Sequence, residues 1–215
     1  KKKFFLKKDD LLNGTDPYSN SKSCAELAVN SYNKSFFKEK KIFVATARAG
    51  NVIGGGDFSK DRIIPDYFRS LLKNQEIILR SPNSIRPWQH VLDPLYGYLL
   101  LLERLHNKQV IGGSSFNFGP NNNSNKTVNE VINLINKNFG NSVKIIKKNN
   151  NSKIYNESKV LMLNSSKSKT TLKWRPKYNL EQSIKLTSLW SKELINKKNN
   201  DILKISKDQI RNYLK

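Results

Sequence analysis

The sequence predicts an α/β fold built on a parallel sheet. Segments in which apolar residues recur every three or four positions alternate along the chain with short runs of apolar and β-branched residues. The first pattern is typical of helices that bury one face, and the second is typical of strands buried in a sheet. Strands that alternate with helices favour a parallel sheet, because parallel neighbours need a crossover connection.

The first half of the chain is expected to alternate between helices and strands. A helix is expected over 18–38, where the apolar residues are spaced by three or four. The run 42–47, apolar except for Thr46, is expected to be a buried parallel strand, and the glycine-rich segment 50–61 a loop. Pro65 opens a helix that extends to residue 73, since its missing N–H costs nothing in a first turn. The other elements expected here are a strand over 76–80 and a strongly apolar helix over 92–105.

The second half continues the alternation. A strand over 116–118 is closed by Gly119-Pro120, and the next helix is expected over 127–139. Thr127 is its candidate N-cap, because Glu130 stands three residues later, as in a capping box. The last expected elements are a strand over 143–147, a helix over 180–196, and a loosely attached helix in the polar tail after residue 196.

Composition excludes several classes of partner. The formal charge of +22 suits nucleic acid, but Lys is spread along the whole chain and the aromatics occupy apolar periodic positions. We therefore expect a solvated basic surface and no nucleic-acid partner. No run of about 18 apolar residues occurs, so no membrane contact is expected, and no metal site is expected either. Cys24 is the sole cysteine and fits a reducing compartment, the cytoplasm.

Tyr18 and Lys22 form a candidate catalytic pair. Four residues apart on a helix, they lie on one face, one turn from each other. An ammonium near a phenol favours the phenolate and lowers the tyrosine pKa from about 10, so that the phenol can act as a general base for an alcohol. The alternative for this pair is a solvated helix with a buried tyrosine.

A glycine-rich loop follows the next strand. The segment from Arg48 to Asp57 holds Gly50, Asn51 and three consecutive glycines, 54–56. Ligands bind at the carboxyl ends of strands in open α/β sheets, and glycines let the backbone approach a ligand closely. The alternative is that the glycines only make a tight loop.

These motifs together resemble a known family. Tyr18-x-x-x-Lys22 followed by Arg48-x-x-Asn51-x-x-Gly54 resembles the extended short-chain dehydrogenase/reductase superfamily, the NAD-dependent epimerases and dehydratases. Within this superfamily the motif residues resemble those of CDP-glucose 4,6-dehydratases more closely, above all in the block Ile85-Arg86-Pro87-Trp88-Gln89-His90. The likeness covers roughly residues 8–192.

The resemblance implies a cofactor site for NAD. Tyr18 would exchange a proton with the C4 hydroxyl of the sugar. Lys22 would bind the nicotinamide ribose and depress the tyrosine pKa, and Gly50 would lie near the nicotinamide.

The resemblance also implies a substrate site for a nucleotide sugar. Asn51 would contact the sugar-diphosphate, and Arg86 would bind the diphosphate, with a surface ion pair as the alternative for this arginine. Arg62, Ile63 and Ile64 would line the nucleotide pocket. No chemistry is expected of His90.

The implied reaction is an internal redox dehydration in deoxysugar biosynthesis, as in lipopolysaccharide O-antigen. Oxidation at C4 makes the C5 proton acidic, water leaves across C5 and C6, and C6 is then reduced, so NAD is regenerated. A homodimer or homotetramer is implied for the intact enzyme.

The resemblance divides the chain into parts of two domains. The chain is expected to contain the distal part of a Rossmann-like parallel sheet domain and, beside it, a smaller α/β substrate-binding domain. The expected parts are 1–52 in the Rossmann-like domain, 53–87 in the substrate domain, 88–119 back in the Rossmann-like domain, 120–196 in the C-terminal substrate domain, and 197–215 as a polar tail.

Some features depart from the family pattern. The glycine-rich dinucleotide fingerprint and the acidic residues used for elimination are absent and would lie before Lys1, so we expect the start to be a cut and this fragment alone to be inactive. Asn156-Glu157 stands where sister families place an arginine, and Asn164 replaces a usual Asp. A sister epimerase, a basic nucleic-acid-binding module and a non-catalytic relic that only dimerises remain the alternatives.

Overall fold

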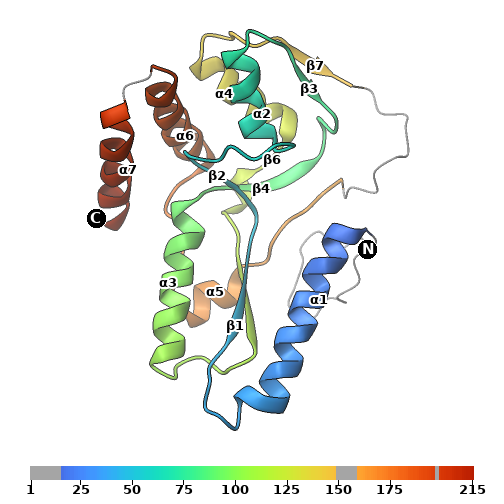
Figure 1. Ribbon diagram of the computed structural model, residues 1–215, viewed down its shortest axis with the longest axis vertical. Coiled ribbons are helices and arrows are strands. Elements are labelled where there is room, and N and C mark those ends of the chain that lie inside the picture. Colours follow the sequence, from blue (N-terminus) through green and yellow to red (C-terminus); the bar gives the residue numbers. More distant parts are fainter. Residues whose placement is uncertain (1–15, 149–158, 197–198) are drawn as a thin grey trace.

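The computed structural model describes residues 16–148, 159–196 and 199–215. The molecule is elongated, with two lobes stacked along its long axis (Figure 1). The lower lobe of this view contains α1 (Pro17–Tyr32), the short π-helix Asn33–Phe37, β1 (Ala45–Ala49), α3 (Leu92–His106), β5 (Ser114–Phe118) and α5 (Ser166–Thr171). The upper lobe contains β2 (Asn51–Ile53), α2 (Ile63–Leu72), β3 (Ile77–Leu79), β4 (Ile85–His90), the 3-10 turn Asn122–Ser124, β6 (Asn125–Thr127), α4 (Val128–Asn138), β7 (Ile145–Lys147), α6 (Leu180–Ile195) and α7 (Asn199–Leu214).

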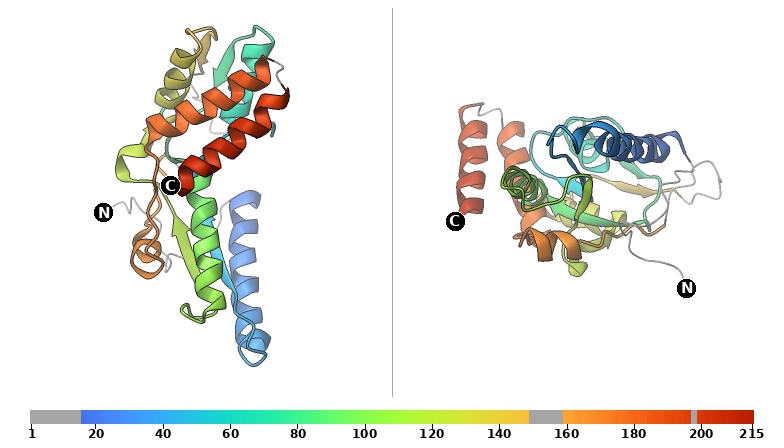
Figure 2. Two further views of the ribbon diagram at one scale, coloured as in Figure 1. Left: turned by 90° about the vertical axis from the view of Figure 1, so that its left-hand side faces the viewer. Right: turned by 90° about the horizontal axis from the view of Figure 1, so that it is seen from below.

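The sheets confirm the predicted α/β class with parallel pairing. In the lower lobe β1 pairs in parallel with β5, and Ala47 lies opposite Phe116. In the upper lobe β4 is central, parallel to β2 and antiparallel to β6. The third pair, β3 and β7, is also parallel. α1 and α3 lie on opposite sides of the β1–β5 pair (Figures 1 and 2).

Each lobe has its own hydrophobic core. In the upper lobe α2, α4 and α6 close over the short strands, and the core centres on Tyr67, Trp88 and Ile132. In the lower lobe α3 and α5 pack against β5, and the core centres on Phe116, Phe118 and Trp174. Trp174 is fully buried and its indole Nε1 donates to the backbone oxygen of Asp93 at 2.9 Å. The core of the lower lobe therefore ends where α3 begins.

Several sequence expectations about strands were wrong. β1 begins at Ala45 rather than at residue 42, because it starts opposite the first residue of β5. None of its residues is fully buried, since among the described residues β1 pairs with β5 alone and α1 faces it with polar side chains. Three strands, β2, β4 and β6, were not expected. β4 is buried on both faces and carries polar residues, so it shows no alternation in the sequence.

The helices follow the sequence more closely. Thr127 caps α4 and shares a capping box with Glu130, as the spacing predicts. The tail does form a helix, α7, but it is firmly rather than loosely attached: Tyr213 is buried and its hydroxyl donates to Asp93 Oδ1 at 2.9 Å. Within the described parts of the chain, no helix has the length and apolarity needed to cross a bilayer.

Candidate active site

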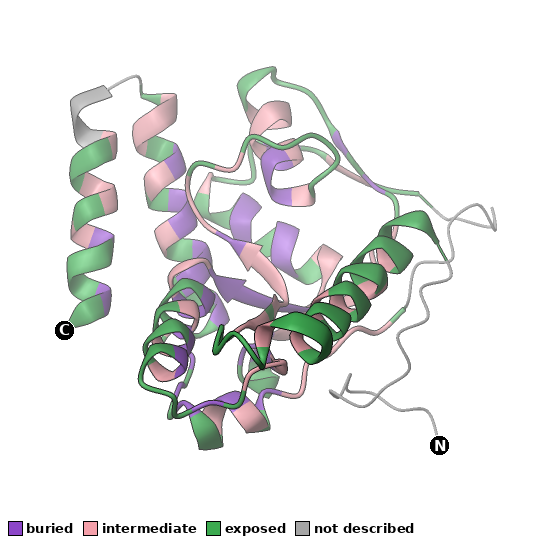
Figure 3. Ribbon diagram, turned by 60° about the horizontal axis from the view of Figure 1, so that its bottom comes forward, coloured by how far each residue is buried: buried purple, intermediate pink, exposed green. Residues whose placement is uncertain are grey.

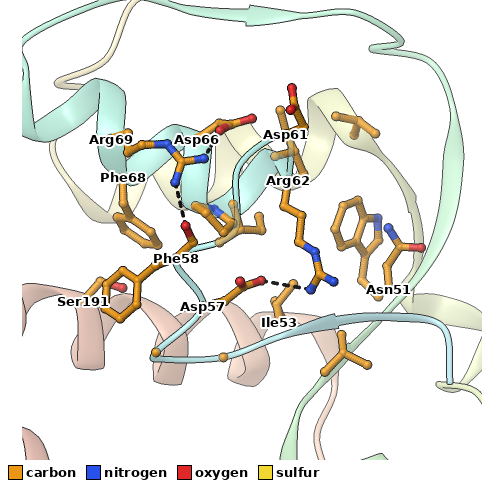
Figure 4. Close-up of a pocket in the computed structure, with 18 of the residues that line it drawn as sticks. Asn51, Ile53, Asp57, Phe58, Asp61, Arg62, Asp66, Phe68, Arg69 and Ser191 are labelled. Atoms are coloured by element: carbon orange, nitrogen blue, oxygen red, sulfur yellow. Dashed lines mark hydrogen bonds and ion pairs between the residues drawn. The ribbon is translucent and has the colours of Figure 1, made fainter.

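A cavity of about 610 Å³ opens beside the junction of the two lobes. Its walls come from the start of α1, the segment from Gly50 through β2 into α2, the strands β3 and β4, and the last turns of α6. Figure 4 shows the part of the wall between the loop after β2 and α2, where charged side chains face one another. The predicted site residues on this wall are Tyr18, Gly50, Asn51, Arg62, Ile63, Ile64 and Arg86.

Lys22 does not line the cavity with the others. It lies one turn along α1 from Tyr18, with its Nζ 5.3 Å from the centre of the tyrosine ring. Tyr18 itself is 74% exposed at the cavity mouth. The structure therefore brings the candidate base together with the candidate substrate residues, and it keeps the lysine beside the base.

The start of α1 is fixed by its own sequence. Asp16 is the N-cap, and its Oδ1 accepts from the backbone N–H groups of Tyr18 and Ser19, both at 3.0 Å. The Ser19 hydroxyl also donates to this carboxylate. Pro17 occupies the first helical turn, where no N–H is needed. The hydrogen bonds from Ser19 and Tyr18 hold the pKa of Asp16 below its usual value. Tyr18 thus has a defined place at the N-terminal end of the helix.

Glu26 ties α1 to the sheet, and sequence analysis did not single it out. Its carboxylate accepts from Arg48 Nε and from the Thr46 hydroxyl, each at 2.8 Å, and from the Ser115 hydroxyl at 3.1 Å. Burial raises the pKa of Glu26, but these hydrogen bonds and the Arg48 charge outweigh burial and hold it below the usual value. Its side chain is 15% exposed, and its partners lie 20 or more residues away in the sequence, so no local pattern marks it.

Gly50 and Arg86 lie where the two lobes meet. A Cβ on Gly50 would stand 2.6 Å from the backbone oxygen of Pro87, so no side chain fits between these two chain segments. Arg86 is 6% exposed and its Nη1 donates to the Ile85 oxygen at 2.9 Å. A nearly buried guanidinium on a cavity wall suits an anionic ligand, because its fork of donors matches phosphate oxygens.

Ion pairs organise the wall shown in Figure 4. Asp57 Oδ2 pairs with Arg62 Nη1 at 3.3 Å. Arg69 pairs with Asp66 and donates to the backbone oxygen of Phe58 at 3.2 Å. Burial raises the pKa of Asp57, but hydrogen bonds from Ser59 and the nearby Arg62 hold it below the usual value. Of the two arginines in these pairs, Arg62 is the one that the sequence analysis assigned to the nucleotide pocket.

The three glycines of the loop have a second role. Sequence analysis assigned them to close approach by a ligand, and Gly54 and Gly56 do line the cavity. Gly55 instead lies on the indole of Trp190, since a Cβ there would be 2.1 Å from Trp190 Cδ2. The explanation of Gly55 by ligand approach was therefore wrong: its neighbour is a side chain of α6.

His90 and Asp93 are buried at the lobe junction. His90 is 1% exposed, and burial lowers its pKa to about 4. Its Nδ1 accepts from the Leu92 N–H at 3.4 Å, and its ring meets Tyr178 edge to face at 5.5 Å. Burial raises the pKa of Asp93, although the Lys177 N–H and the Tyr213 hydroxyl donate to it. Burial therefore shifts the pKa of each group in the direction of its uncharged form.

Two remaining positions concern the family pattern. Asn156 and Glu157 lie outside the described residues. Asn164 Oδ1 accepts from the Ser166 N–H at 2.9 Å, which closes a turn just before α5, and Asn164 does not line the cavity.

Solved structures of known proteins share the fold. The dTDP-glucose 4,6-dehydratase of Bacillus anthracis, solved with NAD, superimposes with a TM-score of 0.72 and 24% identity over 90% of this chain and 57% of that chain. The UDP-glucuronic acid 4-epimerase of Bacillus cereus, solved with UDP-glucuronic acid and NAD, gives a TM-score of 0.76 and 21% identity over 90% of this chain and 58% of that chain. At these identities the likeness establishes the fold, which is the predicted one.

Sequence relatives confirm the resemblance and narrow it to a family. A CDP-glucose 4,6-dehydratase of Salmonella typhimurium is 38% identical over 213 residues, 97% of this chain. The chain spans 58% of the length of that relative. The model of the family described as GDP-mannose 4,6 dehydratase matches residues 2–187, well over half of the sequence, and the chain therefore belongs to this family.

Proposed function

We propose that the complete protein is a sugar-nucleotide 4,6-dehydratase that converts CDP-glucose to CDP-4-keto-6-deoxyglucose with the help of NAD. Tyr18, Asn51 and Arg86 line one cavity of about 610 Å³, and this juxtaposition carries the proposal. Cavities of about 300–1,000 Å³ are typical of small-molecule sites. The 38% identity to a CDP-glucose 4,6-dehydratase supports the choice of substrate. Because the chain spans 58% of that relative, the activity is assigned to the complete protein.

The roles of the substrate residues follow from their chemistry. Arg86, nearly buried, would hold the diphosphate, and the neighbouring Asn51 would hydrogen-bond the sugar-diphosphate. Arg62, Ile63 and Ile64 would line the nucleotide end of the cavity. The cavity lining thus combines cationic and amide donors with apolar side chains, which suits a ligand with a charged middle and a flat base.

Tyr18 would take the proton from the sugar C4 hydroxyl. A phenol with a pKa of about 10 is mostly protonated at neutral pH, so it needs a neighbour that favours its ionised form. Lys22, with Nζ 5.3 Å from the ring centre, is that neighbour in this proposal. Loss of the proton on the C4 oxygen prepares oxidation at C4, and the resulting C4 carbonyl would make the C5 proton acidic enough for water to leave across C5 and C6.

The residues present fit a nicotinamide cofactor at the same place. An ammonium and a phenol one helical turn apart offer the donors that ribose hydroxyls accept, and Tyr18 and Gly50 share the cavity wall. Lys22, Tyr18 and Gly50 would therefore hold the nicotinamide end of NAD. When bound, NAD supplies the hydride acceptor for C4 and the hydride donor for C6.

We extend the proposal to the assembly and location of the complete protein. A homodimer or homotetramer is supported by two exposed aromatic side chains that lie together, Tyr32 at the end of α1 and Phe36 in the π-helix after it, with ring centres 5.7 Å apart. A cytoplasmic location is supported by Cys24, the sole cysteine, which is free and exposed. Light scattering of the purified complete protein tests the assembly.

Turnover of CDP-glucose by the complete protein with NAD tests the function. We expect proton NMR to detect a new C6 methyl signal; a product that keeps its C6 hydroxyl would contradict the dehydratase and point to an epimerase. Tyr18→Phe keeps the ring but removes the base, so kcat should fall by about two to four decades while the Kd for CDP-glucose changes little. Lys22→Met should be comparably harmful and should also weaken NAD binding.

Tyr32→Phe is the matched control, since Tyr32 is a 56% exposed tyrosine on the same helix. It should leave kcat unchanged. Near-normal turnover by the Tyr18→Phe variant would contradict the role of Tyr18.

A further inference from the structure

The C-terminal helix α7 reaches the cavity through one side chain of α6. Trp190 lines the cavity, and its indole Nε1 donates to the Ser206 hydroxyl of α7 at 2.9 Å. The same hydroxyl donates to the Ile202 oxygen of its own helix at 2.8 Å, so it acts both as a hydrogen-bond acceptor and as a donor. Gln209 adds a second bond between the helices, from its Nε2 to the Leu186 oxygen at 3.0 Å. The two helices lie side by side (Figures 1 and 2).

The far end of α7 is anchored as well. The Tyr213 hydroxyl donates to buried Asp93 at 2.9 Å, and Lys177 Nζ donates to the backbone oxygen of Tyr213 at 2.7 Å. α7 is therefore fixed both to α6 and to the lobe junction, and Ser206 holds the indole from a helix that is itself held.

The face of the indole supports the glycine loop. Gly55 lies so close to the ring that a Cβ would be 2.1 Å from Trp190 Cδ2. The Phe58 ring, which lies over α6 near Ser191 in Figure 4, has its centre 6.4 Å from that of Trp190. The ring thus contacts the loop at two points, and Gly54 and Gly56 on either side of Gly55 line the cavity.

The loop in turn orients a charged pair. Asp57 follows the glycines, accepts from the Ser59 N–H at 3.0 Å, and pairs with Arg62 at 3.3 Å. The Arg62 side chain is 66% exposed, so packing does not fix its guanidinium, and the pair with Asp57 is the contact that directs it. The direction of the Arg62 guanidinium therefore depends on where the loop holds Asp57.

We propose that Trp190, held by Ser206, is a positioning residue that fixes the loop 54–57 and, through Asp57, the Arg62 guanidinium for the nucleotide diphosphate. The family match ends at residue 187, so Trp190 and α7 lie outside it. The proposal rests on the proposed function for the identity of the ligand. The contacts from Ser206 to the loop do not depend on that identity.

Hydrogen–deuterium exchange of the complete protein without ligand tests the contacts. Ser206→Ala and Trp190→Phe should each speed amide exchange in 54–59, and Ser206→Thr, which keeps the hydroxyl, should restore the wild-type rate. Ser183→Ala is the matched control, because the Ser183 hydroxyl likewise donates to the carbonyl four residues earlier in its helix. Unchanged exchange in 54–59 for both Ser206→Ala and Trp190→Phe, in variants that unfold at the wild-type temperature, overturns the proposal.

Calorimetric titration with CDP tests the consequence for binding. Losing one supporting hydrogen bond should weaken CDP binding about three- to tenfold in Ser206→Ala, with Ser206→Thr and Ser183→Ala near wild type. Wild-type affinity in Ser206→Ala overturns the link to Arg62. If the wild-type protein itself does not bind CDP, the proposed function fails, and the exchange result alone decides whether Trp190 positions the loop.

Discussion

The two lobes hold their helices by different means. In the upper lobe α4 buries Val131, Ile132 and Ile135 completely. In the lower lobe α1 buries no residue fully, and its apolar side chains Leu27 and Tyr32 are exposed. Figure 3 shows the contrast, with α1 largely exposed and the centre of the upper lobe buried. α1 is held instead by polar bonds from Glu26 to the sheet.

This contrast separates two tasks. Apolar burial is non-directional and gives most of the stability of a lobe. Hydrogen bonds to one carboxylate are directional, so they fix how a helix is rotated about its axis and where it lies along that axis. Among the described residues, apolar burial holds the helices of the upper lobe, whereas directional polar bonds attach α1 and set where Tyr18 stands.

The largest effect on the free energy of unfolding should come from the hydrophobic core of the upper lobe. Ile132→Ala should lower the free energy of unfolding by about 2–5 kcal/mol, because it leaves a cavity in a fully buried site. Leu27→Ala on α1, where the side chain is 53% exposed, should change it by no more than about 0.5 kcal/mol. Urea unfolding of both variants measures the difference, and similar losses would erase the contrast between the lobes.

The junction between the lobes should respond to acid. The folded protein keeps His90 neutral down to a pKa of about 4, whereas an ordinary imidazole has a pKa of 6.5. Between these values the unfolded chain binds more protons, so stability present above pH 6.5 is lost as the pH falls toward 4, by up to ~3 kcal/mol.

His90→Gln should flatten this slope in unfolding measurements between pH 7 and 4. His106→Gln is the control, since His106 is the other histidine and is exposed at the end of α3. An equal slope in wild type and His90→Gln would show that the junction is not the acid-sensitive part.

A smaller effect is expected from the attachment of α1. Glu26→Gln removes the charge that pairs with Arg48 and should cost about 1–3 kcal/mol, because hydrogen bonds to charged groups are worth about that much when partly buried. Asp208→Asn, which removes an exposed pair with Arg211, should cost no more than about 0.5 kcal/mol. Thermal unfolding compares the two, and hydrogen exchange in α1 should rise for Glu26→Gln alone.

Local patterns in the sequence were enough for most helices. Thr127 and Glu130 mark the start of α4, and Asp16-Pro17 stands where α1 begins, because caps involve residues near one another. β4 was missed because Arg86, Gln89 and His90 are buried in a central strand and break the expected apolar pattern.

The residues of the candidate site likewise fall into those that the sequence reveals and those that only the fold reveals. Tyr18 could be proposed from its spacing to Lys22 and Asn51 from the family resemblance, and both line one cavity. The supports of that cavity could not, because Glu26 meets Ser115 and Trp190 meets Gly55 across long stretches of chain. Such pairs carry no local signal: only the fold determines which distant residues touch.

The way the chain crosses between the lobes has a mechanical consequence. Gly50 alone separates β1 from β2, and Val91 alone separates β4 from α3. The first crossing packs against β4, since Gly50 has no room for a Cβ beside Pro87. Hinge closure needs residues that can absorb large backbone rotations, and single-residue crossings, one of them packed against a strand, offer little room for such rotations. We therefore expect the cavity to keep its shape when a ligand enters, and X-ray scattering of the free and ligand-saturated protein to give the same radius of gyration.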